Sequence, residues 1–228
     1  MTETRITHTR VPISKAATVA IAAIVAYQVV LVVLIFLRPD IDPSWHTISE
    51  LAFGRYGWVM SGGFLLSALS YGALFVMLMY QARGIMGRIG LVLLAVCCLG
   101  ALGVGVCRTD PMPLHSPLSI RGAIHVVSGT AQLMLLPFAA LLINLSLALR
   151  NRDWVRAKRV LFWTSCLPLF GWACFVGYTI LFVVPMGKDA YGPGVNIGWP
   201  PRFAFLTYAL WLVVVSWQGL KLGRVASS

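Results

Sequence analysis

The sequence is poor in charged residues, and poorest in acids. Only 11% of its 228 residues are charged, and 7 Asp and Glu stand against 18 Lys and Arg. Soluble proteins carry charge on roughly a quarter of their residues, so this composition excludes an ordinary soluble domain. Hydrophobic residues make up 59% of the chain and the mean hydropathy is +0.83. This composition predicts an integral membrane protein.

Paired cysteines are also missing. The chain has five cysteines, an odd number, and they form no C-x-x-C pair. This arrangement gives no support to a disulfide framework or a zinc ribbon. All five lie within or beside apolar runs, which is typical of small packing residues. They are Cys97, Cys98, Cys107, Cys166 and Cys174.

Six runs without charge are each long enough to cross a bilayer, which takes about 20 helical residues. They lack the alternation of a membrane barrel, so we predict an all-α bundle of six transmembrane helices in one domain, residues 1–228. Gly100 and Gly103 have the spacing of close helix contacts. The predicted spans are residues 16–37, 58–80, 89–107, 122–149, 160–186 and 203–220.

The net charge of +11 comes from basic residues that flank these runs. Such residues usually set membrane topology, so we predict no nucleic-acid partner. Most lie near the termini and in the loops after the second and fourth spans, which places both termini in the cytoplasm. We expect a multi-pass plasma-membrane protein with membrane lipids as partners. A homo-oligomer and a partner membrane protein both stay open.

A polar segment, residues 46–54, separates the first two spans. Thr47 and Glu50 have the spacing of a capping box, which predicts a short interfacial helix over about 47–53. His46 and Glu50 would lie one turn apart on it, so an imidazole and a carboxylate can share a face. Ser49 belongs to the same segment. A purely structural hydrogen bond is the alternative to a functional site here.

Further ionisable groups fall at the same end of the predicted bundle. Asp110 follows the third span, either as a solvated turn residue or bent back into the bundle. Arg121 and His125 share a helix face, and His125 lies inside an apolar span, where ionisable groups are functional candidates by default. A buried histidine bonded to a carbonyl is the alternative. Residues 187–202, rich in Gly and Pro and ending at Arg202, predict a non-helical outer loop that folds down over the bundle.

His46, Asp110, His115 and His125 could together hold a metal ion, with Glu50 as a base. Zinc is the candidate cofactor, because it takes nitrogen and oxygen ligands of these kinds. No H-E-x-x-H motif joins these residues, and His115 lies in a Pro-rich loop where it is expected to be solvated.

The I-S-E-L-A segment, the Asp-Pro pair at 110, His125 and a Gly-x-x-x-Arg element resemble a prokaryotic six-span family known as a domain of unknown function (DUF998-like). The matching residues are Ser49, Glu50, Asp110, His125 and Gly198 with Arg202. That family is distantly similar to the DRAM/Sfk-type membrane proteins. The resemblance implies a six-helix bundle with a polar outer pocket and a link to lipid handling.

Several functions fit these features. The first is binding of a lipid or isoprenoid-like molecule, with an anionic head held by Arg121 and Arg202 and oriented by Glu50, Asp110 and His125, and with His46 and Ser49 as further ligand-binding residues. An intramembrane enzyme is the alternative, either a metal-dependent lipid hydrolase or an acid catalyst on a prenyl substrate that uses Glu50 or Asp110. A transporter is disfavoured, because the polar groups cluster on one side and the two halves hold no matching broken helices.

Overall fold

The computed structural model describes residues 4–112, 117–187 and 190–225. Six helices in these residues are long and apolar enough to cross a membrane, and the described residues contain no strand, which confirms the predicted all-α class. Their bounds are α1 Thr4–Leu37, α2 Gly57–Leu78, α3 Gly84–Val106, α4 Ile120–Arg150, α5 Lys158–Tyr178 and α7 Trp199–Val225.

Shorter helical segments complete the fold. A 3₁₀ turn, η1 Ile48–Ala52, connects α1 to α2, and another, η2 Arg152–Ala157, connects α4 to α5. After α5 the chain continues directly through a π-helical segment, η3 Thr179–Val183, into α6 Val184–Met186.

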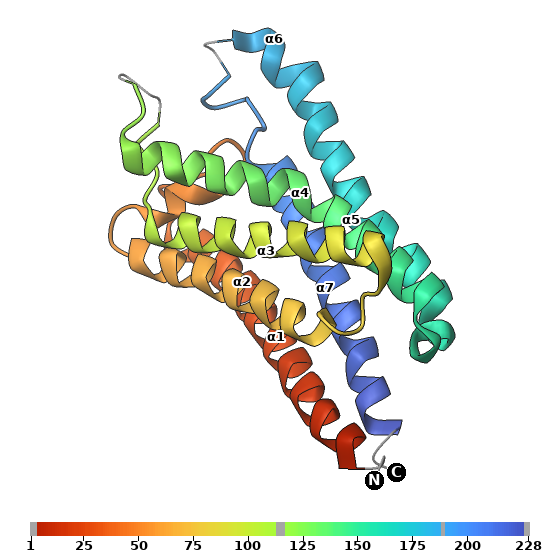
Figure 1. Ribbon diagram of the computed structural model, residues 1–228. Coiled ribbons are helices and arrows are strands. Elements are labelled where there is room, and N and C mark those ends of the chain that lie inside the picture. The colour runs from red at the N-terminus through yellow and green to blue at the C-terminus, as the bar shows by residue number, and fades with distance from the viewer. Residues whose placement is uncertain (1–3, 113–116, 188–189, 226–228) are drawn as a thin grey trace.

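The helices form a closed ring. Each long helix packs against the next one in the chain, and α7 packs against both α5 and α1. Figure 1 shows α7 running between α1 and α5, with α2, α3 and α4 stacked beside them. Residues 38–56, the start of α4, and residues 190–202 therefore come together at one end, which we call the polar end.

Every long helix differs from its predicted span at one end or both; α1, for example, begins at Thr4 and not at residue 16. The helix α3 begins at Gly84, five residues before the uncharged run, because Arg88 is accommodated within its first turns. The helix α7 begins at Trp199 and includes Pro200, Pro201 and Arg202, which were predicted to belong to a loop. Proline is tolerated in the first turn of a helix, where its missing N–H would have no partner.

Small residues and satisfied polar groups hold the interior together. A Cβ on Gly100 would lie 2.7 Å from the carbonyl oxygen of Ser128, so α3 and α4 approach closely there, as the glycine spacing predicted. Inside the ring the hydroxyl of Ser70 donates to the Ala20 carbonyl at 2.7 Å, and that of Tyr208 to the Leu133 carbonyl at 2.8 Å. Such bonds satisfy hydroxyl groups that cannot reach water.

Candidate functional site

The short helix η1 is fixed to the bundle by its apolar side chains. Ile48, Leu51 and Ala52 are all buried, at 6%, 1% and 4% exposure. The Thr47 N–H donates to Glu50 Oε2 at 2.6 Å, which is the carboxylate half of the predicted capping box. The predicted short helix is therefore present, as a tight 3₁₀ turn one residue shorter at each end. Its two polar residues, Ser49 and Glu50, are held in fixed directions.

Glu50 connects η1 to the loop before α7. Its side chain is buried, and its second oxygen, Oε1, accepts a hydrogen bond from the Tyr191 hydroxyl. Burial raises the pKa of the Tyr191 phenol above its ordinary value, and the bond to Glu50 raises it further. This bond places the part of the loop around Tyr191 against η1.

Ser49 lies against His125 of α4. His125 is only 4% exposed. Its Nδ1 lies 2.6 Å from the Cys107 carbonyl oxygen, which can only accept, so Nδ1 carries the proton and donates. The Nε2 atom is then the acceptor, and the Ser49 hydroxyl donates to it at 2.7 Å. The sequence left open the alternative of a buried histidine bonded to a carbonyl. That alternative describes Nδ1 but not Nε2, which bonds to Ser49.

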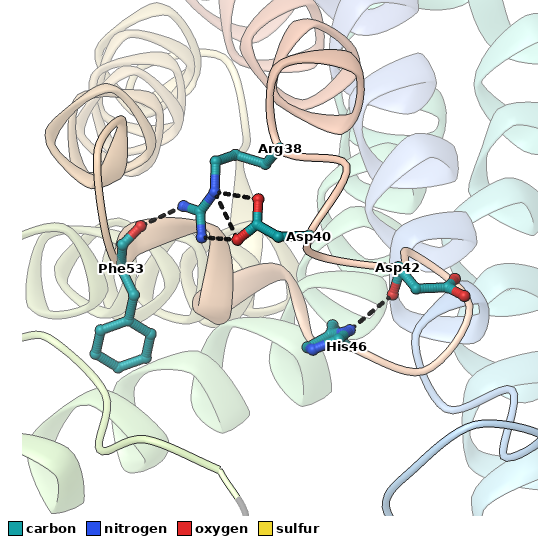
Figure 2. A network of polar contacts seen from close by, with 5 residues as sticks. All are labelled: Arg38, Asp40, Asp42, His46 and Phe53. Carbon is teal, nitrogen blue, oxygen red and sulfur yellow. Dashed lines mark hydrogen bonds and ion pairs between the residues drawn. The ribbon is translucent and has the colours of Figure 1, made fainter.

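Arg38 joins the two ends of the α1–α2 connection. Its Nε donates to Asp40 Oδ1 at 2.9 Å and its Nη2 to Asp40 Oδ2 at 2.7 Å, while Nη1 donates to the Phe53 carbonyl. Figure 2 shows the guanidinium between these two partners. The paired guanidinium lowers the pKa of the Asp40 carboxyl below its ordinary value. Every nitrogen of Arg38 is thus satisfied.

Arg202, in the first turn of α7, is satisfied differently. A single nitrogen, Nη1, donates to the carbonyls of Pro43, His46 and Gly198 at 3.1, 2.8 and 2.8 Å. The Nε and Nη2 atoms are buried and have no hydrogen-bond partner within the described residues. Among those residues the only other buried side-chain N or O atom in this state is Ser216 Oγ. The negative charges of Glu50 and Asp42 lie close enough to act on the guanidinium.

His46 belongs to the loop that Arg202 holds. Its ring stacks on Trp45, with centroids 3.6 Å apart, and its Nδ1 lies 3.1 Å from the Asp42 carbonyl oxygen (Figure 2). The Tyr191 ring meets it edge-on, with centroids 6.2 Å apart. His46 therefore forms part of an aromatic cluster above η1, and it is Ser49, rather than His46, that contacts His125.

Asp110 and Arg121 both lie at the start of α4. The Asp110 carboxylate accepts from the Ser119 N–H and hydroxyl, both at 2.7 Å, and so anchors the start of α4. An anion at a helix N-terminus is favoured by the helix dipole. Arg121 is exposed, although it shares a helix face with the buried His125.

The predicted metal ligands do not gather among the described residues. No group of three or more His, Cys, Asp or Glu side chains in those residues could hold a metal ion. His46, Asp110 and His125 each bond to a different part of the chain, and His125 uses both ring nitrogens. His115 lies outside the described residues.

Sequence reasoning missed the roles of Arg38 and Tyr191. Arg38 had one available signal, since an arginine directly after an apolar span and two residues before an acid often forms a local ion pair. Nothing in the local sequence relates Tyr191 to Glu50, because 141 residues separate them and only the return of the chain to α7 brings them together.

The family model described as Protein of unknown function (DUF998) matches residues 20–218. The chain belongs to this family. The match runs from α1 to α7 and so includes η1, His125 and Arg202, which confirms the family resemblance. The more distant similarity to DRAM/Sfk-type proteins stays a prediction. Comparisons with curated proteins and with solved structures gave no match.

Proposed function

We propose that this membrane protein binds a lipid with an anionic head group, held by Arg202 at the polar end, with an acyl or isoprenoid chain along α1 and α7. The observation that carries this proposal is the alignment of two features. Within the described residues the buried Nε and Nη2 of Arg202 have no hydrogen-bond partner, and Arg202 lies one helical turn before Leu206, a wall residue of an apolar groove.

The groove has a volume of about 330 Å³, near the lower end of the range of roughly 300–1,000 Å³ for small-molecule sites. It lies between α1 and α7, and every lining residue except Gln28 is apolar. Its α7 wall is Leu206, Ala209, Leu210 and Val213. A groove of this kind on a surface that faces lipid fits a hydrocarbon chain.

Helix geometry connects the groove to Arg202. The α7 wall residues follow Arg202 at spacings of 4, 7, 8 and 11, which place all of them on one helix face. On α1, the buried Tyr27 directly precedes the groove residue Gln28. A lipid tail in the groove would therefore bring its head group toward the guanidinium.

The chemistry of Arg202 suits a phosphate or carboxylate head. Guanidinium Nε and Nη2 point in parallel and bind two oxygens of such a group at once. Buried donors without partners are costly, by about 1–3 kcal/mol each, and a ligand that satisfies them removes that cost. The exposed Arg121, predicted as a second ligand for the head group, is not needed for this arrangement.

The test is native mass spectrometry of protein released from nanodiscs that contain phosphatidylglycerol and phosphatidylcholine. We expect the wild type to retain phosphatidylglycerol. Arg202→Lys, which keeps one donor for the three carbonyls but removes Nε and Nη2, should lose most of it. Arg38→Lys is the matched control and should retain the lipid. Equal retention in the wild type and Arg202→Lys would refute the proposal.

A further inference from the structure

The contact between Ser49 and His125 points to chemistry beyond binding. We propose that Ser49 is a nucleophile and His125 its general base, and that the pair cleaves a carboxylic ester of a membrane lipid through an acyl-serine intermediate. The choice of a lipid as the ester rests on the proposed function. The nucleophile–base pair itself rests on separate observations.

The geometry has the three parts that an activated serine requires. The Ser49 Oγ to His125 Nε2 distance is 2.7 Å, within the roughly 2.6–3.2 Å needed for proton transfer. A third group, the Cys107 carbonyl, accepts from Nδ1 at 2.6 Å and fixes the tautomer in which Nε2 is free to act as a base. In serine hydrolases a carboxylate usually fills this third position.

The position of Cys107 also favours the protonated base. Cys107 directly follows α3, so its carbonyl lies beside the C-terminal, negative end of a 23-residue helix. When His125 takes the proton from Ser49, the imidazolium donates through Nδ1 to this carbonyl. The interaction strengthens as positive charge develops on the ring, which is the condition for stabilising a transition state.

The two members of the pair differ in accessibility in the required way. His125 is 4% exposed, and the Phe64 ring meets it edge-on at 6.2 Å, so the base is shielded. Ser49 is half-buried, and its only side-chain hydrogen bond within the described residues is the one to His125. The buried apolar side chains of η1 hold it in place, as a nucleophile on a rigid element requires.

The reaction balances with these residues and water. The Ser49 Oγ attacks the ester carbonyl carbon while its proton passes to His125 Nε2, and the bond from the acyl carbon to the leaving alcohol breaks as that alcohol takes the proton from Nε2. Water then attacks the acyl-serine and gives a proton to Nε2. The bond to Oγ breaks, the proton returns to Ser49, and a carboxylic acid leaves.

A long-chain alkyl fluorophosphonate tests this assignment on the purified full-length protein. Attack by Oγ on phosphorus expels fluoride and leaves a stable adduct, which peptide mass spectrometry can locate. We expect the adduct on Ser49 and its complete loss in Ser49→Ala. His125→Asn keeps an amide that can donate to Cys107 but removes the base, so labelling should slow by about 10²–10⁴-fold. Circular dichroism melting of each variant checks the fold.

Ser44→Ala is the matched control, because Ser44 lies half-buried in the same connection and its hydroxyl bonds to no histidine among the described residues. Its labelling should equal that of the wild type. A folded wild type without a Ser49 adduct, or equal labelling rates for the wild type and His125→Asn, would overturn the assignment and leave the contact as a structural tie.

Arg202→Lys separates this inference from the proposed function. Its lipid retention tests the lipid site, while the Ser49 labelling rate of His125→Asn tests the nucleophile. If labelling slows in His125→Asn but Arg202→Lys retains its lipid, the nucleophile assignment is supported and the proposed lipid site is refuted. The reverse result would leave a binding protein without this chemistry.

Discussion

Arg38 and Arg202 lie at the same end of the bundle and have the same chemistry, yet their surroundings differ. Arg38 is 8% exposed, and Asp40 and the Phe53 carbonyl together satisfy all of its nitrogens. Arg202 uses one nitrogen for three carbonyls and leaves two buried nitrogens without a partner in the described residues. The first arrangement stabilises a connection. The second keeps binding capacity at a cost in stability, which proteins tolerate mainly at functional sites.

The largest effect is expected from Gly198→Ala, which disturbs the carbonyl groups that Arg202 bonds to. A Cβ at this position would lie 2.2 Å from the Pro43 carbonyl oxygen, 2.7 Å from that of His46 and 2.8 Å from Arg202 Nη1. The start of α7 would have to leave the loop that it packs against. We expect a loss of about 1–3 kcal/mol or more, as for overpacked sites. Both the melting temperature and lipid retention should fall.

Gly62→Ala is the control for that experiment. Gly62 lies within α2, and a Cβ there would meet nothing within 4 Å. Alanine is favoured over glycine in a helix by roughly 1 kcal/mol, so this variant should melt at or above the wild-type temperature. Equal melting temperatures for the two variants would show that Gly198 does not support the polar end.

A smaller effect is expected from Arg38→Ala, which sharpens the contrast between the two arginines. The variant loses an ion pair that is screened because Asp40 is 61% exposed, and it leaves the Phe53 carbonyl without its donor, so the total loss should be about 1–2 kcal/mol. The melting temperature should fall while phosphatidylglycerol is retained. Loss of the lipid together with unchanged melting would reverse the roles that we assign to Arg38 and Arg202.

The sequence predicted the bundle well, because long uncharged runs report directly on membrane spans. It also singled out Ser49, Glu50, His125 and Arg202, since polar groups beside or within apolar spans are few and conspicuous. Their partners could not be predicted. The bond between Ser49 and His125 joins residues 76 positions apart, and it depends on how η1 is seated in the ring. The position of η1 in the ring is set by tertiary packing, which produces no recognisable pattern in the local sequence.

The smallest effect concerns the acid that distinguishes Arg38 from Arg202. Arg38 lowers the pKa of Asp40, so the folded state favours the ionised carboxylate. Its contribution to stability is fully present above the unfolded-state pKa of about 3.9 and is lost as the pH falls through the lower, folded-state value. The Asp40 side chain is 61% exposed, so solvent and salt screen the pair and the contribution is small. Asp40→Asn should therefore melt slightly below the wild type at pH 7, and this difference in melting temperature should narrow in high salt and close in acid.

Arg202 has no hydrogen-bonded carboxylate within the described residues, so the melting temperature of Arg202→Lys should show no matching acid-dependent difference from the wild type. A gap for Asp40→Asn that persists unchanged at pH 3 would mean that Asp40 contributes through packing, and the difference between the two arginines would then not lie in their ion pairing.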